Sequence, residues 1–183
     1  MEHRESVEVR SRVSSQPPPD LRRIGVVSDT HNNLPNAARI VELFNAAQVD
    51  CVVHTGDITQ AKTLEVLARL EAPLIGVYGN NDVGERDSLD AAARRLQFEF
   101  VDGPLYLEWA GRRIVVVHDP VTLPSPAARP HDVALHGHDH RLTQESRDGV
   151  LVFNPGECAG HMPGHNAVGV LDLVRLETEI LRF

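Results

Sequence analysis

Five short motifs in this chain carry aspartate, histidine and asparagine, whose side chains bind divalent metal ions. Each motif directly follows a short run of apolar residues. The motifs are Asp29-Thr30-His31, His54-Thr55-Gly56-Asp57, Gly79-Asn80-Asn81-Asp82, His118-Asp119 and His136-Gly137-His138-Asp139-His140. Imidazole and carboxylate ligands together suit Zn, Mn, Fe, Ni or Co. Because the motifs contain no cysteine, the pattern disfavours a structural zinc site.

The spacing within the motifs allows pairs of side chains to meet one ion. Asp29 and His31 are two residues apart, as are His138 and His140. In extended backbone such residues point to the same side, so each pair could bind one metal. Asp57 follows a glycine that allows a tight turn, and a carboxylate can bridge two cations.

Taken singly, each motif also has a purely structural interpretation. An Asp-x-His sequence in a loop is commonly a cap or a surface turn, and Asn80 could be an ordinary turn residue. His118 ends an apolar run, and in isolation it is better explained as a core histidine with a satisfied hydrogen bond. The two closely spaced histidines His138 and His140 favour metal binding by themselves. For the other motifs, the joint pattern makes metal binding the stronger hypothesis.

Short strands must hold these motifs in place. Apolar, β-branched runs bounded by turn residues predict buried strands, and apolar spacing near 3.6 residues predicts helices between them. The predicted strands are 23–28, 50–54 and 74–78, and the predicted helices are 37–44, 60–71 and about 86–96. This alternation predicts a parallel sheet. Open α/β sheets place ligands beyond the carboxyl ends of their strands, which would gather the motifs into one site.

The sequence of the second half of the chain predicts pairs of antiparallel strands. Residues 105–109 and 113–117 flank the turn Ala110-Gly111-Arg112 and predict a hairpin, and a second hairpin is expected to turn at Asp148-Gly149. Residues 168–183 alternate apolar and polar side chains, which predicts two edge strands. The expected fold is of the α/β class, with two mixed sheets packed face to face and helices outside.

Length, charge and cysteine content restrict the class of protein. The 183 residues suffice for one domain, and a net charge of −8 disfavours a nucleic-acid polymer as the main partner. Cys51 and Cys158 make no disulfide framework, so a reducing, cytoplasmic setting is the default. No apolar run approaches the length of a membrane span. The sequence leaves open whether the protein forms a homo-oligomer.

The first 22 residues differ in composition from the rest. They mix charges, serine and the run Pro17-Pro18-Pro19, with little apolar surface. We expect residues 1–22 to form a flexible tail, with a short docking segment for a partner as the alternative. The folded domain is expected over residues 23–183.

In their order along the chain, the motifs resemble those of the calcineurin-like metallophosphoesterase superfamily, and within it the small single-domain phosphodiesterases of the YfcE type. The resemblance covers residues 23–183 and includes Asn154-Pro155-Gly156, a turn common in this branch after the last ligands. It implies a four-layer αββα sandwich with a dinuclear metal centre. By motif, the ligands would be Asp29, His31 and His140 for one metal, Asn80, His118 and His138 for the other, and Asp57 as the bridge.

The resemblance also implies hydrolysis of phosphate esters, diesters more than monoesters. A hydroxide that bridges two cations attacks phosphorus in line, while the metals neutralise charge on the phosphoryl oxygens. The expected catalytic residues are Asp57, Asn80, Asn81 and His118, and the expected substrate is a small phosphate ester. Two alternatives stay open: a phosphoesterase fold used as a binding scaffold without catalysis, and a cyclic-nucleotide phosphodiesterase.

The residues beside the expected ligands depart from the family pattern. Many members have histidine where this chain has Asn81, which donates hydrogen bonds but is no general acid near neutral pH. Substrates with good leaving groups should suffer least from this change. Asp82 is either a residue that orients a ligand or a turn carboxylate. His54 and His136 are expected to support the ligands rather than bind metal.

Further departures lie in the later loops. Asp119 stands where relatives often have glycine, and Glu157 follows the Asn-Pro-Gly turn in place of serine. Gly164 takes a position at which relatives often have arginine, a phosphate-binding cation. His161 and His165 could substitute for that cation, or they could be ordinary exposed loop histidines.

Overall fold

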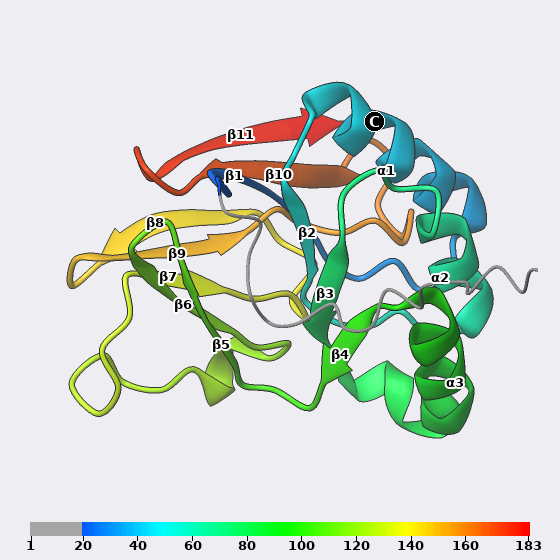
Figure 1. Ribbon diagram of the computed structural model, residues 1–183, viewed down its shortest axis with the longest axis horizontal. Helices are drawn as coiled ribbons and strands as arrows, with labels where there is room; N and C mark the ends of the chain where they lie inside the picture. The colour runs from blue at the N-terminus through cyan, green and yellow to red at the C-terminus, as the bar shows by residue number, and fades with distance from the viewer. Residues whose placement is uncertain (1–19) are drawn as a thin grey trace, which may run out of the picture.

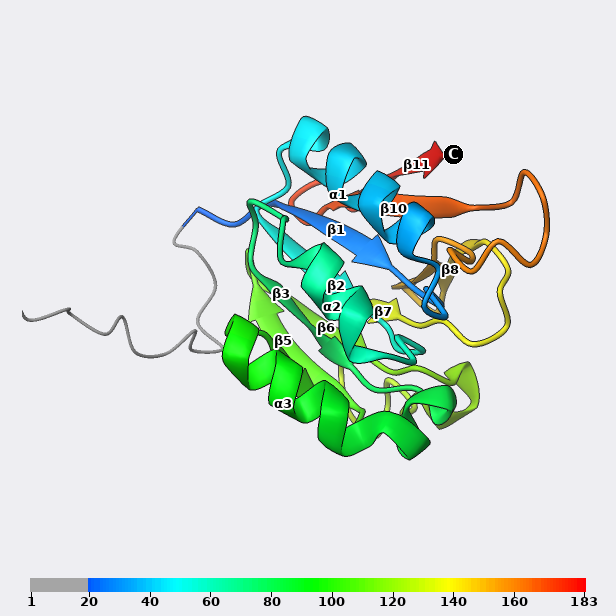
Figure 2. The ribbon, with the colours of Figure 1, turned by 90° about the vertical axis from the view of Figure 1, so that its right-hand side faces the viewer.

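Two β-sheets packed face to face make up most of the protein, and three α-helices cover the outer face of the larger sheet (Figures 1 and 2). The structure is a computed structural model and describes residues 20–183. No helix among these residues combines the length and the apolarity that crossing a bilayer requires.

The first half of the chain alternates strand and helix, as predicted up to the third helix. Four parallel strands form one side of the larger sheet: β1 (Arg23–Val27), β2 (Cys51–His54), β3 (Leu74–Val77) and β4 (Glu99–Val101). The helices between them are α1 (Leu34–Ala47), α2 (Ala61–Leu67) and α3 (Arg86–Leu96), with the 3-10 helix η1 (Asn80–Glu85) directly before α3. Because each crossover returns the chain to the same edge, the carboxyl ends of these strands lie together.

Helix α1 shows how local sequence specifies its elements. The Asn33 side chain accepts a hydrogen bond from the Asn36 backbone N–H at 3.2 Å and caps the helix, whose first turn contains Pro35. Its apolar residues recur every three or four positions and are buried: they are Ala37, Ile40, Val41 and Phe44. A Cβ on Gly25 of β1 would lie 2.7 Å from the Phe44 ring, so glycine there lets helix and strand approach closely.

The C-terminal strands extend the larger sheet on the other side of β1. β10 (Ala167–Asp172) pairs antiparallel with β1, and β11 (Glu177–Arg182) pairs antiparallel with β10, which gives the order β11-β10-β1-β2-β3-β4. The prediction of two edge strands is wrong for β10, which lies inside the sheet. Its residues are buried without interruption from Ala167 to Leu171, as in a strand covered on both faces.

The second sheet has the order β5-β6-β7-β9-β8. Its strands are β5 (Leu105–Trp109), β6 (Arg112–Val116), β7 (Val133–Leu135), β8 (Thr143–Arg147) and β9 (Val150–Asn154). The predicted hairpins are β5 with β6 and β8 with β9, whereas β6, β7 and β9 run parallel. Both sheets are therefore mixed, as expected.

The core lies in two layers that follow the alternation of side chains along each strand. In β1, Ile24 and Val26 pack between the two sheets, whereas Val27 packs with the helices. Trp109 from β5 and Phe153 from β9 fill the space between the sheets from the other side. This packing fixes the two sheets relative to each other, and with them the loops at their carboxyl ends.

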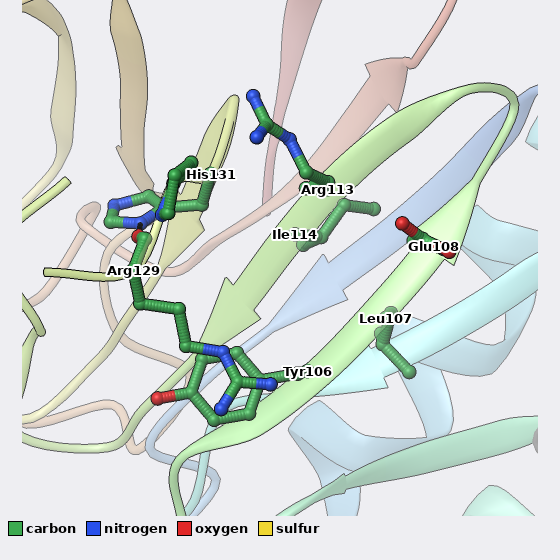
Figure 3. Close-up of a pocket in the computed structure, with 8 residues that line it drawn as sticks. Tyr106, Leu107, Glu108, Arg113, Ile114, Arg129 and His131 are labelled. Carbon is green, nitrogen blue, oxygen red and sulfur yellow. Dashed lines mark hydrogen bonds between the residues drawn. The ribbon is translucent and has the colours of Figure 1, made fainter. Parts of the chain in front are cut away.

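The outer face of the second sheet carries no α-helix among residues 20–183. The segment that follows β6 contributes one 3-10 turn, η2 (Pro120–Thr122), and Leu123 packs on this face. A hollow of about 390 Å³ lies there, in which the Arg129 Cζ is 3.3 Å from the centroid of the Tyr106 ring (Figure 3). The expected α/β class with two packed mixed sheets is confirmed, with a loop and a single helical turn over the second sheet.

The end of one helix and the presence of one strand differ from the prediction. Helix α2 ends at Leu67 instead of near residue 71, because the chain tightens into turns in which Arg69 N–H donates to Val66 O and Leu70 N–H donates to Leu67 O. Strand β4 was not predicted, since three residues are too few to show a periodicity.

The predicted tail over residues 1–22 lies outside the described residues except at its end. Leu21 is 4% exposed and packs in the cluster between the sheets. The packed part of the chain therefore includes at least one residue before β1.

Candidate metal centre

The five motifs meet at the carboxyl ends of β1, β2, β3, β6 and β7. Backbone hydrogen bonds join their loops: Asp29 N–H donates to Gly56 O at 3.1 Å, and Gly137 N–H donates to His118 O at 3.0 Å. His138 N–H donates to Asp29 Oδ2 at 3.1 Å and so connects loops from the two sheets. All seven residues predicted as ligands therefore lie around one place.

One group of ligand atoms surrounds a buried oxygen of Asp29. Asp29 Oδ1 lies 3.4 Å from His140 Nε2 and 3.8 Å from His31 Nε2, and these two nitrogens are 3.3 Å apart. The residue is 0% exposed, and Oδ1 accepts no hydrogen bond from the described residues, whereas Oδ2 accepts one from the Ser28 hydroxyl. A buried carboxylate oxygen without a donor is expensive to desolvate, and a cation would satisfy it.

A second group of ligand atoms surrounds the Asn80 side chain. Asn80 Oδ1 lies 3.0 Å from His118 Nε2 and 3.0 Å from His138 Nδ1, and the two nitrogens are 3.2 Å apart. His118 Nδ1 lies 2.9 Å from Thr55 O. A carbonyl oxygen only accepts, so Nδ1 of His118 carries the hydrogen and Nε2 presents its lone pair to the site.

Asp57 stands between the two groups. Its Oδ2 is 3.4 Å from His31 Nε2 on one side and 3.4 Å from His118 Nε2 on the other. Asn81 holds this carboxylate, because its side-chain N–H donates to Oδ2 at 2.7 Å and its backbone N–H donates to Oδ1 at 2.9 Å. A single carboxylate is thereby placed where it could contact two cations.

The distances between ligand atoms fit metal coordination. Two nitrogens that each lie about 2.0–2.1 Å from one tetrahedral ion are about 3.3 Å apart. The nitrogen pairs His31–His140 and His118–His138 are separated by 3.3 Å and 3.2 Å. Both groups therefore match the spacing that one shared ion requires, and the donor sets of nitrogen, carboxylate and amide oxygen suit borderline divalent metals.

The two central carboxylates are charged at neutral pH. Burial by itself raises the pKa of Asp29, but the contacts with His31 and Ser28 and the nearby His118 and His140 imidazoles together lower it by more than burial raises it. Burial also opposes ionisation of Asp57, and contacts with His118 and Asn81 nevertheless hold the pKa of this carboxyl well below its usual range. The ionised form is the one that binds a cation.

Five of the seven residues adopt left-handed backbone. The φ angles are 52° at Asp29, 40° at His31, 59° at Asp57, 74° at His138 and 57° at His140. The expectation that the i, i+2 pairs reach the site from extended backbone is therefore wrong. Such conformations cost roughly 1–3 kcal/mol each and persist where the surroundings impose them, commonly at functional sites.

Two further features hold the loops in these conformations. The Asp82 carboxylate is 0% exposed and accepts hydrogen bonds from Thr59 N–H at 2.7 Å and Gly79 N–H at 2.8 Å, so it ties the second motif to the third. At Gly137, an added Cβ would lie 1.9 Å from Ser28 Oγ and 2.8 Å from Asp29 Oδ2. Only glycine allows this loop to lie against the Asp29 carboxylate.

His54 and His136 take no part in either group of ligand atoms. His54 is fully buried, and its Nδ1 accepts a hydrogen bond from Gly56 N–H at 3.0 Å while Nε2 contacts Thr30 Oγ1 at 3.2 Å. Burial lowers the pKa of His54 to about 4. His136 Nδ1 lies 3.1 Å from Gly137 O. These contacts match the supporting role predicted for both residues.

Sequence reasoning did not include the Asn154 side chain in the site. Its Nδ2 donates to Asp139 Oδ1 at 2.8 Å and to Gly137 O at 3.3 Å, and its Oδ1 accepts from Gly156 N–H at 2.9 Å. It thereby fastens the Asn-Pro-Gly turn to the loop that carries His138. The only signal for it in the sequence was the turn motif itself.

The loop after this turn places its two histidines differently. The His161 ring centroid lies 5.3 Å from the centroids of both His31 and His140. His165 is exposed, and its backbone N–H donates to Met162 O at 3.1 Å. Only His161 adjoins the candidate metal centre.

Asp119 directly follows the expected ligand His118. Its side chain caps η2 by accepting a hydrogen bond from Val121 N–H at 2.9 Å.

The chain belongs to the calcineurin-like phosphoesterase superfamily, whose domain model matches residues 23–175. Phosphodiesterase MJ0936 of Methanocaldococcus jannaschii is 35% identical over 159 residues, which cover 85% of this chain and 95% of that protein. Phosphodiesterase YfcE of Escherichia coli K12 is 26% identical over 165 residues, covering 83% of this chain and 88% of that protein. The predicted family is confirmed.

Solved structures agree with this assignment. One, of an archaeal phosphodiesterase, has a TM-score of 0.78 at 31% identity and covers 88% of this chain and 99% of that chain. Calcineurin-like phosphoesterases use a dinuclear divalent metal centre, and the Asp and His groups described above could bind such ions.

Proposed function

We propose that this calcineurin-like phosphoesterase is a phosphodiesterase that hydrolyses small phosphate diesters at a dinuclear metal centre. One observation carries the proposal: Asp57 Oδ2 lies 3.4 Å from a nitrogen of His31 and 3.4 Å from a nitrogen of His118, between two groups of ligand atoms. The relatives described above are named phosphodiesterases, which supports diesters as the substrate class. We assign the first metal to Asp29, His31 and His140, the second to Asn80, His118 and His138, and the bridge to Asp57.

Bound divalent cations supply Lewis acidity, which lowers the pKa of water and offsets the charge on phosphoryl oxygens. The chain's own residues arrange that chemistry. Thr55 O orients the His118 imidazole through Nδ1. Asn81 can donate a hydrogen bond to a phosphoryl oxygen but no proton to a leaving group at neutral pH. The proposal therefore favours diesters whose leaving group departs without protonation.

Exposed apolar side chains beside the ligands support ester groups with apolar surface. Val83 is 75% exposed and follows Asn80 by three residues in η1, and side chains three residues apart eclipse in a 3-10 helix. Val121 is 88% exposed and follows His118 by three residues. Two exposed valines therefore follow proposed ligands closely in the chain, which is compatible with ester groups that have apolar surface.

Two alternatives make different predictions for the same protein. A binding scaffold without catalysis needs no intact ligand set, whereas all seven side chains are present and lie together. A cyclic-nucleotide phosphodiesterase would use the same metal chemistry and differ only in the surrounding pocket. We also propose a cytoplasmic location, supported by Cys51 and Cys158, which are buried and unpaired.

The test measures metal content and turnover on the same protein. Protein loaded with Mn, Co or Ni should contain about two ions per chain and should hydrolyse an activated aryl phosphodiester. Asp57→Asn should lower kcat by at least about 10²-fold, because it removes the charge between the two groups. Asp148→Asn, at a hairpin turn where asparagine tolerates the left-handed backbone, is the matched control and should leave turnover unchanged.

Each outcome separates the candidates. Metal content well below one ion per chain after loading would favour the scaffold. Turnover of cyclic nucleotides well above that of aryl diesters would favour the cyclic-nucleotide enzyme. No turnover on any diester, with Asp57→Asn indistinguishable from the wild type, would rule out catalysis.

A further inference from the structure

Two buried polar side chains inside the metal-binding motifs have no part in the proposed reaction. Thr30 stands between the expected ligands Asp29 and His31. His54 is the last residue of β2 and precedes Asp57 by three residues. Both side chains belong to residues that are 0% exposed. Buried polar groups are costly unless each finds a partner, so the hydrogen bonds of these two side chains indicate what they do.

One backbone donor sets the direction of these hydrogen bonds. Gly56 N–H donates to His54 Nδ1 at 3.0 Å, so Nδ1 carries no hydrogen and the neutral ring has its hydrogen on Nε2. His54 Nε2 lies 3.2 Å from Thr30 Oγ1 and therefore donates to it. The Thr30 hydroxyl donates in turn to the backbone oxygen of Asp57, 3.4 Å away.

This chain of three hydrogen bonds joins two loops that carry ligands. The same Asp57 oxygen also accepts the backbone N–H of His31 at 3.0 Å. Asp29, His31 and Asp57 all adopt left-handed backbone, which residues with a side chain keep only where their surroundings impose it. The contacts of Thr30 therefore lie where the loop of the first metal meets the loop of the bridging carboxylate.

We propose that Thr30 is a positioning residue for the dinuclear centre and that His54 orients its hydroxyl. This inference deepens the proposed function and rests on the dinuclear centre assigned there. Thr30 acts through the backbone, because its hydroxyl holds Asp57 O beside the loop that presents Asp29 and His31. The spacing between the bridging carboxylate and these two ligands then depends on one hydroxyl group.

The burial of His54 makes this contact hard to replace. Within residues 20–183, the Thr30 hydroxyl is the hydrogen-bond partner of His54 Nε2. Removing the hydroxyl leaves a fully buried donor without an acceptor and Asp57 O without one of its two donors. We expect the loops to move apart to relieve this, and the ligands to move with them.

The first measurement needs no variant and no metal. In NMR spectra of the imidazole nitrogens of metal-free, full-length protein, His54 should carry its hydrogen on Nε2 and none on Nδ1. A hydrogen on Nδ1 would reverse the order of donors, and the role given to Thr30 would be wrong.

The second measurement is Zn²⁺ affinity, determined with a competing chelator. Thr30→Val keeps the shape of the side chain without its hydroxyl and should weaken zinc binding by about 10–100-fold. Thr30→Ser keeps the hydroxyl and should bind both ions as the wild type does. The Co²⁺-loaded Thr30→Val protein should also show an altered visible absorption spectrum, which Thr30→Ser restores.

Thr63→Val is the matched control. Thr63 is a buried threonine whose hydroxyl donates to Ile58 O at 3.4 Å and contacts no histidine. This variant should keep both zinc constants, even if it unfolds at lower urea concentration than the wild type.

The outcomes distinguish this inference from the proposed function. Wild-type zinc constants in Thr30→Val, or equal losses in Thr30→Val and Thr30→Ser, would show that the hydroxyl does not position the ligands. An equal loss in Thr63→Val would show a general effect of destabilisation and would also overturn the role. Urea unfolding of the metal-free variants shows whether each is folded. Wild-type protein that takes up fewer than two ions would instead overturn the dinuclear centre.

Discussion

The backbone N–H of Asp57 donates a hydrogen bond to the buried carboxylate of Asp82 at 3.1 Å. The same carboxylate also accepts the N–H groups of Thr59 and Gly79. Asp82 thus fixes the left-handed turn that presents the proposed bridging carboxylate, and it does so without entering either group of ligand atoms. The two interpretations left open for Asp82, a turn carboxylate and a residue that orients a ligand, describe the same contacts.

We expect Asp82→Ala to unfold at lower urea concentration than the wild type. Leaving a buried donor without its acceptor costs about 1–3 kcal/mol, and three donors share this carboxylate, so the loss should be about 3 kcal/mol or more. Glu85→Ala, which removes an exposed carboxylate from the same 3-10 helix, should change the free energy of unfolding by less than about 0.5 kcal/mol. Equal stability of the two variants would contradict the role given to Asp82.

Gly137→Ala should disturb the metal centre more than the fold. An added methyl group would overlap Ser28 Oγ and press on Asp29 Oδ2, so the loop carrying His138 must move away from the Asp29 carboxylate. We expect metal affinity to fall by about 10-fold or more, as for other changes that displace ligand supports. Gly84→Ala is the control, because a Cβ there meets nothing within 4 Å. Chelator competition on both variants would show whether the close approach at Gly137 matters.

Asn81→His should widen the range of substrates. Asn81 contacts the Asp57 carboxylate and cannot protonate a leaving group, whereas an imidazole at this position could. We expect kcat for alkyl diesters with poor leaving groups to rise by up to about 10²-fold, with little change for an activated aryl diester. Asn81→Gln introduces no acid and should show no such gain. A ratio of the two kcat values that stays constant in Asn81→His would contradict the expectation.

His54 should make stability depend on pH. Burial lowers its pKa in the folded protein to about 4, against an ordinary value of 6.5. Between these values the unfolded chain binds a proton that the folded chain excludes, so stability is lost as the pH falls through this window. The loss should reach about 3 kcal/mol at pH 4.

Urea unfolding of the metal-free protein at several pH values tests this expectation. His54→Gln lacks the titrating group, so the difference in unfolding free energy between wild type and variant should shrink by about 3 kcal/mol from pH 6.5 to pH 4. Other histidines titrate in both proteins and cancel in the difference. A difference that does not change with pH would show that His54 is protonated in the folded state.

The elements of the first half could be predicted because their signals are local. Helix α1 follows from Pro35 and the apolar spacing up to Phe44, and the β-branched runs of β1 to β3 follow from burial on both faces. Features that depend on which strands pair with each other could not be predicted from the sequence. The prediction of two edge strands came from the alternation over residues 168–183 as a whole, whereas β10 itself is buried from Ala167 to Leu171, and its pairing with both β1 and β11 shows that it is interior. Strand β4 exists because β3 offers it a partner.

The candidate site likewise has features that could be predicted from the sequence and features that could not. By itself the sequence determined which side chains are available, since Asp29, Asp57 and His118 stand out by residue type and by their place after apolar runs. Only the tertiary structure decided how they are presented. The left-handed turns, the carboxylate of Asp82 behind Asp57, and the Thr30 hydroxyl beside Asp57 O depend on contacts between residues far apart in the chain. Such contacts leave no periodic trace in the sequence, because each is made once, by loops that meet only after both sheets have packed.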